Sequence, residues 1–370
     1  MRVGVEARLL SSARPTGIEN HLRELLRGFS ELDDPPELIL YTREETPPVP
    51  FGVIRPIRVP FGWLSLALPI VATLERCNAL YFPYPVLPPI TPRPTATIVF
   101  DVSFLIMPQL YPPEMLSNLV RPIELGVRRA DRVIAISKQT AQDLRTHYDL
   151  PSEKIALIYP GAPSGFSRIP DADRIVAERF SLTGPYILGV GTIQPRKNFR
   201  RLVEAFALLV EREGIQHHVV IAGQEGWGWQ EVSEAIGKYG LSSRVHVLGY
   251  VDRAAMAALY SSAELLAFPS LYEGFGFPIL EAMACGAPVL TSSVSSMPEA
   301  AGDVALYVDP LEVESIAQGI LRLITDESLR ADLVQKGLGR TALFSWRESA
   351  RQTADLFRQL AGLQKESQER

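Results

Sequence analysis

Two glutamates eight positions apart mark the stretch of this chain with the clearest capacity for chemistry. Glu273 and Glu281 follow an apolar run that ends at residue 268, and glycine, phenylalanine and proline fill the first positions between them. The pattern predicts a strand, a loop and then a helix that opens at Pro278, because the fixed φ of proline suits the first helical position. A pair of carboxylates first suggests acid/base catalysis. One glutamate on the loop and one on the helix favours instead the binding of two ends of one ligand.

The loop between these glutamates is also a predicted anion site. Backbone N–H groups at a helix N-terminus have no acceptor within the helix, and the helix dipole favours negative charge there. The N–H groups of Phe275, Gly276 and Phe277 are expected to point at whatever lies in front of the helix.

Two adjacent cations, Arg196 and Lys197, follow a turn that contains Gly189 and Gly191. The turn begins like a dinucleotide fingerprint, but Gln194 replaces the third glycine, so a dinucleotide site is not expected. Cations beside a helix N-terminus suit a diphosphate, whose charge must be neutralised when its bond breaks. On the residues alone, two solvated loop charges are an equal alternative.

Other polar positions allow two interpretations each. Asp101 follows an apolar strand and suits a binding or catalytic role, or a helix cap or turn. Gly17 opens a helix within residues 14–19, where it permits close approach of a phosphate or an acceptor, or only starts the helix. Asp171 and Asp173 have the spacing of an acidic metal-binding pair, but capping of the helix that follows is favoured. No metal site is predicted.

Strands and helices alternate in two runs along the chain. The first run has expected strands near residues 3–5, 38–41, 79–82, 97–100, 132–136 and 155–159, and helices near 17–29, 116–130 and 137–147. The second has expected strands near 186–190, 218–222, 245–248, 262–268, 289–291 and 305–308, and helices near 199–212, 231–239, 254–261 and from 313 onward. This alternation predicts an α/β chain with two Rossmann-like domains. Ligands of such sheets lie beyond the carboxyl ends of the strands, so the site is expected in a cleft between the domains.

Composition agrees with two globular domains and narrows the classes of function. The chain has 370 residues, 46% hydrophobic and 21% charged, with a net charge of −5. The lack of a basic excess argues against a nucleic-acid partner. Two cysteines, Cys77 and Cys285, and an N-terminus that reads as a strand predict a reducing, cytoplasmic location. The longest apolar stretch, residues 61–74, contains Pro69 and is too short to span a bilayer.

Taken together, these residues resemble the retaining glycosyltransferases of family 4 (GT4), which have the GT-B fold. The similarity covers nearly the whole chain. Residues 186–198 look like the family's donor-phosphate loop, Glu273 to Glu281 like its Glu-x7-Glu signature, residues 296–303 and 308–310 like its closing segment, and residues 344–346 like the start of its last helix. The resemblance implies an acceptor-side domain at 1–168, a nucleotide-sugar domain at 169–345, and a helix at 346–370 that packs back on the first, with the two parallel sheets facing across a cleft.

The resemblance also implies roles for the site residues. Glu281 would bind the ribose hydroxyls of a nucleotide, and Glu273 would hold hydroxyls of the donor sugar. Arg196 and Lys197 would stabilise the departing nucleoside diphosphate, so that no divalent metal or other cofactor is needed. Asp101 joins these as a catalytic candidate. The implied donor-binding set is Gly17, Gly191, Thr192, Gly223, Tyr250, Val251, Gly274, Phe275, Gly276, Phe277 and Glu281.

Two positions depart from the family pattern. Many relatives have His-Asp where this chain has Phe100-Asp101, and many have an arginine where this chain has Thr192. The first departure removes a polar contact near the reacting centre and leaves open a shifted donor preference or reduced activity.

The implied activity is transfer of a mannose-like or glucose-like hexose, from a donor such as GDP-mannose or UDP-glucose, to an acceptor hydroxyl with retention. The acceptor would be a saccharide or lipid-linked saccharide of a cell-surface polysaccharide or glycolipid. Two alternatives stay open: a nucleotide-sugar 2-epimerase, which would use cleft histidines and acids instead, and a non-catalytic sugar-nucleotide-binding protein, which only Phe100 supports.

Peripheral contact with an anionic membrane is a further open interpretation. Residues 61–74 and four arginines suggest that the first domain can rest on a membrane surface; these arginines are Arg121, Arg128, Arg129 and Arg132. A core helix and a solvated basic face are the alternative.

Overall fold

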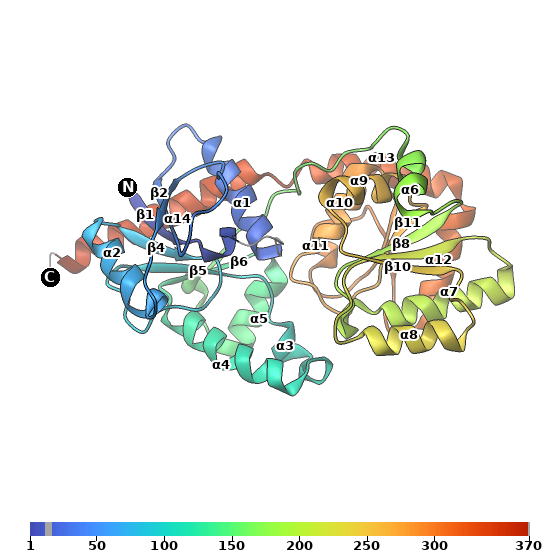
Figure 1. The fold of residues 1–370 in the computed structure, drawn as a ribbon, viewed down its shortest axis with the longest axis horizontal. Coiled ribbons are helices and arrows are strands. Elements are labelled where there is room, and N and C mark those ends of the chain that lie inside the picture. The colour runs from blue at the N-terminus through green and yellow to red at the C-terminus, as the bar shows by residue number, and fades with distance from the viewer. Residues whose placement is uncertain (12–16, 369–370) are drawn as a thin grey trace. The chain divides into compact units, whose positions relative to one another are not determined.

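The computed structural model describes residues 1–11 and 17–368, with side chains through residue 362, and Figure 1 labels its elements. It divides into two compact units. Unit 1 contains Met1–Pro108, Pro113–Gly161 and the chain from Phe344 on, and unit 2 contains Gln109–Pro112 and Ala162–Leu343.

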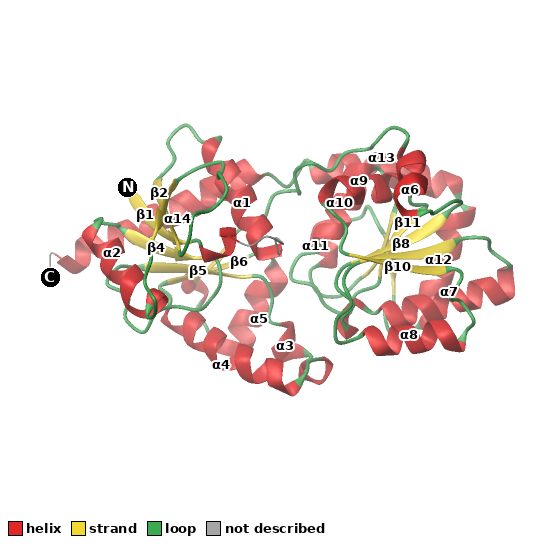
Figure 2. Ribbon diagram, in the orientation of Figure 1, coloured by secondary structure: helices red, strands yellow, loops and turns green. Residues whose placement is uncertain are grey.

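A seven-stranded parallel sheet forms the centre of unit 1, in the order β3-β2-β1-β4-β5-β6-β7. Its strands are β1 (Arg2–Glu6), β2 (Glu37–Thr42), β3 (Val53–Pro56), β4 (Ala79–Phe82), β5 (Thr95–Val99), β6 (Arg132–Ala135) and β7 (Ile155–Leu157). Helices α1 (Gly17–Ser30) and α14 (Trp346–Gln368) lie on one face, and α4 (Pro113–Arg129) and α5 (Lys138–Tyr148) on the other (Figure 2). The π-helix η2 (Trp63–Ala67), α2 (Leu68–Leu74) and α3 (Ser103–Ile106) lie between strands in the sequence.

Unit 2 has a six-stranded parallel sheet in the order β10-β9-β8-β11-β12-β13. Its strands are β8 (Tyr186–Val190), β9 (His218–Ala222), β10 (Val245–Gly249), β11 (Leu265–Phe268), β12 (Val289–Ser292) and β13 (Leu306–Val308). Helices α7 (Phe199–Glu213), α8 (Trp229–Lys238) and α12 (Val313–Thr325) cover one face (Figure 2). The other face carries α6 (Ala172–Phe180), α9 (Arg253–Ser262), α10 (Phe277–Cys285) and α13 (Glu327–Thr341), and α11 (Met297–Ala301) follows β12.

The central strands β8 and β11 of unit 2 are largely apolar because helices bury both faces of the sheet. Ile187, Leu265 and Leu290 are fully buried on three neighbouring strands, and Phe206 of α7 and Ile316 of α12 are equally buried against them. Both sheets show the Rossmann strand order, so the two predicted Rossmann-like domains are observed. None of the described helices is long and apolar enough to cross a membrane.

The structure differs from the sequence-based expectations in four details. The edge strand β3 was not expected, because Val53–Pro56 ends in proline within a proline-rich stretch that reads as loop. The units separate after Gly161 rather than after residue 168. The reason is that the intervening segment packs on unit 2: the ring of Phe166 lies 5.8 Å from that of Tyr260, and Ile169 N donates to Ser261 Oγ.

The other two differences concern helix starts. Helix α10 begins at Phe277, so Pro278 occupies its second position rather than its first. Asp171 stands at the N-cap of α6, but its side chain makes no capping hydrogen bond, since the residue has a left-handed φ of 55°. Asp173 instead accepts a hydrogen bond from Ser262 Oγ. Among the side chains of residues 1–11 and 17–362, no cluster of three or more His, Cys, Asp or Glu is placed to hold a metal ion.

Candidate functional site

The carboxyl edge of the unit 2 sheet brings together most of the donor-site residues expected from the sequence. Gly191 follows β8, Gly223 follows β9 and Gly249 ends β10, and these strands are neighbours in the sheet. The three loops are in close contact: Gly191 N donates to Ala222 O at 3.0 Å, and Gly223 pairs with Gly249. A Cβ on Gly223 would lie 2.0 Å from Gly191 O, so only glycine fits there. The predicted role of Gly223 in donor binding remains a prediction, while its role in loop packing is evident.

Glu273 lies in the loop after β11, where its carboxylate forms ion pairs with two cations. Arg196 Nη1 is 2.9 Å from Oε2, and Lys197 Nζ is 2.6 Å from Oε1. Arg196 Nη1 also donates to Tyr272 O at 3.0 Å. Gly191 leaves little room for a side chain, because a Cβ there would lie 3.0 Å from Lys197 Cε and its φ of 124° is one that residues with a Cβ rarely adopt. The cations therefore contact the glutamate directly, and are not solvated loop charges.

This cluster carries a net positive charge. Burial alone would raise the pKa of Glu273, which is 7% exposed, but the charges of Arg196 and Lys197 outweigh it and lower the pKa to about 2. One carboxylate against two cations leaves one positive charge, in a place shielded from water where electrostatic interactions are strong. Such a cluster suits a ligand with more than one negative charge, as a diphosphate has.

Helix α10 adds a second source of positive potential. Its N-cap, Gly276, has a φ of 107°, which a residue with a side chain rarely adopts. Within the described chain, the N–H groups of Gly276 and Phe277 have no hydrogen-bond acceptor.

Glu281 occupies the first turns of α10, as expected, and Tyr260 of α9 holds it in place. Tyr260 Oη donates to Glu281 Oε2 at 2.8 Å, and this tyrosine is fully buried. Burial raises the pKa of Glu281, although the hydrogen bond from Tyr260 acts in the opposite direction. A carboxylate fixed in this way is a ready acceptor for hydroxyl groups.

Three residues that support the site were not singled out from the sequence. Ser295 Oγ and Ser296 Oγ donate to Glu273 O at 2.6 and 2.7 Å. Asn198 Nδ2 donates to Pro269 O at 3.0 Å and to Pro310 O at 2.7 Å, and so joins three loops of the edge. Two of them stand within motifs already noted, since Asn198 follows Lys197 and Ser296 opens the closing segment. Their supporting role could not be predicted, because their hydrogen-bond partners are distant in sequence.

The remaining donor-site candidates of unit 2 lie along the same edge. Thr192 is exposed in the loop after β8. Tyr250 directly follows β10 and is 55% exposed, and Val251 comes next. Their contact with a nucleotide remains a prediction.

Unit 1 holds the other candidates. Asp101 follows β5 and accepts hydrogen bonds from Ser103 N, at 2.9 Å, and from Ser103 Oγ, so it makes a turn contact, while its catalytic role remains a prediction. Gly17 is the first residue of α1 and is exposed, while Arg14, Pro15 and Thr16 lie outside the described residues. Phe100 packs edge-on against His21, with ring centroids 5.0 Å apart. Burial lowers the pKa of His21 to about 3, so the imidazole is neutral there.

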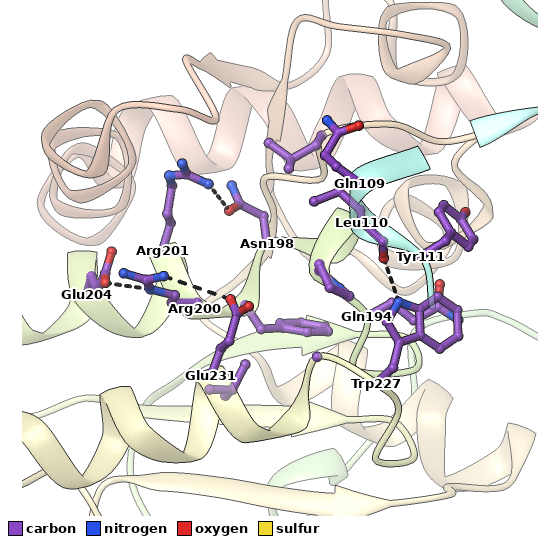
Figure 3. A pocket seen from close by; sticks show the side chains of 15 residues that line it. Gln109, Leu110, Tyr111, Gln194, Asn198, Arg200, Arg201, Glu204, Trp227 and Glu231 are labelled. Carbon is purple, nitrogen blue, oxygen red and sulfur yellow. Dashed lines mark hydrogen bonds and ion pairs between the residues drawn. The ribbon is translucent and has the colours of Figure 1, made fainter. Parts of the chain in front are cut away.

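A cavity of about 480 Å³ lies on unit 2 beside the same loop (Figure 3). Gln194 and Asn198 line it together with Arg201 and Trp227, whose Nε1 donates to Leu110 O at 2.7 Å. The described residues around this cavity do not include Glu273, Glu281 or the glycines of the α10 turn. The cavity is therefore distinct from the charged cluster, and no sequence signal pointed to it.

Comparison with known proteins adds independent findings. The sequence profile of Glycosyl transferases group 1 matches residues 173–340, and that of Glycosyltransferase Family 4 matches residues 106–164. O-antigen chain mannosyltransferase B of Escherichia coli is 30% identical over 266 residues, which are 71% of this chain and 70% of that protein. The serotype-specific mannosyltransferase WbdA of E. coli is 33% identical over 237 residues, 63% of this chain and 29% of WbdA, so the chain spans under a third of that relative.

Solved structures share the fold of the whole chain. Sucrose-phosphate synthase of Thermosynechococcus elongatus has a TM-score of 0.76 at 22% identity, covering 98% of this chain and 99% of that one. Anabaena HepE, solved in complex with UDP and glucose, has a TM-score of 0.75 at 20% identity, covering 97% of this chain and all of that one. At these identities the likeness speaks for the fold alone.

Proposed function

Since the chain belongs to glycosyltransferase family 4, within the glycosyl transferases group 1, we propose that it is a retaining mannosyltransferase. It is a glycosyltransferase with the GT-B fold, as the resemblance implied. The nucleotide-sugar 2-epimerase and the non-catalytic binding protein are accordingly set aside. The donor sugar, the stereochemistry, the lack of a metal and the acceptor are the proposed parts.

The names of the relatives support mannose as the sugar and an O-antigen-like polysaccharide as the product. E. coli mannosyltransferase B and WbdA are both mannosyltransferases, and mannosylfructose-phosphate synthase of Agrobacterium fabrum is 29% identical over 236 residues. We propose GDP-mannose as the donor to try first, and a saccharide, free or lipid-linked, as the acceptor. A cytoplasmic location is part of the proposal, and Cys77 and Cys285 are both free thiols.

The single observation that carries the mechanism is the buried cluster of Glu273, Arg196 and Lys197 at the carboxyl edge of the sheet. The donor diphosphate would accept hydrogen bonds from the Gly276 and Phe277 N–H groups and lie beside the two cations. Glu281 would accept hydrogen bonds from the ribose hydroxyls, and Glu273 from the hydroxyls of the hexose. The nucleotide and the sugar are then held at both ends with the diphosphate between them.

The transfer needs few further groups. The bond between the anomeric carbon and the phosphate oxygen breaks, and Arg196, Lys197 and the α10 N-terminus stabilise the negative charge that develops on the diphosphate. The acceptor oxygen forms its bond on the face of that carbon from which the diphosphate departs, so the configuration is retained. The proton of the acceptor hydroxyl passes to the leaving phosphate oxygen, so no dedicated base is needed. The protein cations do the electrostatic work that a divalent metal does elsewhere.

The test is a transfer assay with GDP-mannose and UDP-glucose in the presence of a chelator. We expect release of GDP from GDP-mannose that increases with an oligomannoside acceptor, and a product whose new linkage is α by NMR. A β-linked product would exclude retention, and full dependence on added metal would exclude the metal-free mechanism. A new nucleotide-sugar isomer without transfer would point to the epimerase.

A further inference from the structure

The segment of residues 46–74 in unit 1 has an unusual charge pattern. It contains no Asp or Glu over 29 positions, and its two charged residues are Arg55 and Arg58. It forms the edge strand β3, then η2 and α2, which continue one another as a helical stretch from Trp63 to Leu74.

The inner side of this helical stretch anchors it to unit 1. Trp63, Leu68 and Ala72 are almost fully buried in a cluster with Ile57 and Leu80. Trp63 Nε1 donates to Ile57 O at 3.0 Å. The position of the outer side is therefore fixed by the packing of the inner one.

The outer side is apolar and exposed. Phe61 is 84% exposed, Leu66 63%, Ile70 56% and Leu74 75%. Leu66, Ile70 and Leu74 are four residues apart and thus lie in one row along the helical stretch. The described chain has sixteen exposed large apolar side chains, and six of them fall within residues 53–74. These six are the four side chains just named together with Val53 and Val59. A concentration of this kind marks an interaction surface rather than scattered surface residues.

The charges beside this row favour an anionic partner. Arg55 and Arg58 are exposed, and Arg58 pairs with the equally exposed Glu45, a contact that contributes little stability. Arg55 pairs with Glu75, so the nearest carboxylate at the end of the row is neutralised. An apolar row flanked by cations has the chemistry of a helix that lies in a membrane interface.

The arginines of α4 are a weaker choice for the same purpose. Arg128 pairs with Glu124, Arg129 donates to Pro88 O and Pro89 O, and Arg132 donates to Asp131 O. Arg55 and Arg58 also have local partners, so the difference lies in the apolar side chains: of those on α4, only Leu125 is exposed among the described residues.

We infer that Phe61, Leu66, Ile70 and Leu74 insert into the surface of an anionic lipid bilayer, with Arg55 and Arg58 at its phosphates. We call this surface the α2 face; it lies on unit 1. Membrane binding by the α2 face does not depend on the proposed transfer reaction, so it can be measured in the absence of donor and acceptor. Each apolar side chain that becomes fully buried favours the bound state by roughly tenfold or more. Each arginine near the surface adds about fivefold.

The experiment is flotation of the whole protein with vesicles of phosphatidylcholine containing phosphatidylglycerol, and with vesicles of phosphatidylcholine alone. We expect wild type to float with the anionic vesicles and weakly or not at all with the neutral ones. The variant with Phe61, Leu66, Ile70 and Leu74 changed to serine is expected to lose this binding at every salt concentration. Arg58→Gln is expected to weaken it about fivefold at low salt.

The matched control changes Leu311, Leu338 and Leu343 to serine, since these unit 2 side chains are also more than half exposed. It is expected to float like wild type, and thermal unfolding verifies that both variants are folded. Wild type that does not bind anionic vesicles, or a folded serine variant that binds them as well as wild type, overturns the inference. Sedimentation without lipid compares the oligomeric states of wild type and the serine variant. If wild type is a dimer, the serine variant is a monomer and neither binds lipid, the inference is overturned and the α2 face is assigned to a second copy of the chain.

Discussion

Lys197 holds its ammonium 2.6 Å from one carboxylate oxygen of Glu273, and both side chains are buried. Arg196 binds the other oxygen of the same carboxylate. The proposed nucleotide-sugar site is thus built on a carboxylate that is neutralised before any donor arrives, and the formal charges of the three side chains sum to +1.

The first prediction concerns the positive charge of Lys197. Lys197→Ala should lower kcat by about 10²–10³-fold, because a preorganised cation that stabilises the leaving diphosphate is lost. Steady-state kinetics at saturating donor measures it. Arg200→Ala is the control, since Arg200 is exposed and pairs with Glu204 on the surface of α7. An unchanged kcat in a folded Lys197→Ala protein would remove this lysine from the mechanism.

The second prediction concerns acid stability. The pKa of Glu273 is about 2 in the folded protein and about 4.3 in an unfolded chain, so ionisation stabilises the fold above pH 4.3 and this stabilisation is lost as the pH falls toward 2. The contribution at pH 7 is on the order of 3 kcal/mol. The difference in free energy of unfolding between wild type and Glu273→Gln should therefore shrink by about half between pH 7 and pH 3. A difference that stays constant with pH would contradict the ionised, paired glutamate.

The third prediction concerns the turn before α10. Gly276→Ala should lower the affinity for a nucleoside diphosphate about tenfold, since Ala is strained at a φ of 107° and its Cβ would lie 3.1 Å from Ile279 Cδ1. Calorimetric titration with GDP measures the loss. Gly339→Ala is the control, because Gly339 lies exposed in α13 with open space around it, and this change should stabilise the fold by about 0.5–1 kcal/mol. Equal affinities for GDP in the two variants would argue against phosphate binding at this turn.

The fourth prediction concerns the hydrogen bond from Tyr260 to Glu281. Tyr260→Phe removes the hydrogen bond that lowers the pKa of Glu281, so that pKa should rise further. The acid limb of the pH profile of kcat/KM for the donor should move to higher pH, because the ionised form accepts the ribose hydroxyls. Tyr186→Phe is the matched control: Tyr186 is also buried and donates to Leu259 O, with no contact to Glu281. Both variants should lose about 1 kcal/mol of stability, and only Tyr260→Phe should shift the profile.

Local pattern was sufficient for much of the fold and for the position of the site. The alternation of strands and helices, the loop position of Glu273 and the helical position of Glu281 all follow from spacing and from glycine and proline. The ion pairs of Glu273 do not, because Arg196 lies 77 residues away and meets it only when β8 and β11 become neighbours in the sheet. The same holds for Ser295 and Ser296, which reach Glu273 from the loop after β12.

In unit 1 the sequence allowed two roles for Asp101, which follows β5. Its hydrogen bond from Ser103 N is the local turn contact that the sequence permits, and its catalytic role remains a prediction. Strand β3 escaped prediction because an edge strand needs neither a long apolar run nor freedom from proline.

A crystal structure of the protein with bound GDP, grown in the presence of a chelator, would locate the donor diphosphate. We expect the diphosphate within hydrogen-bonding distance of the Gly276 and Phe277 N–H groups and beside Lys197, with the ribose hydroxyls at Glu281. GDP bound elsewhere, for example in the cavity lined by Gln194 and Trp227, would contradict this expectation.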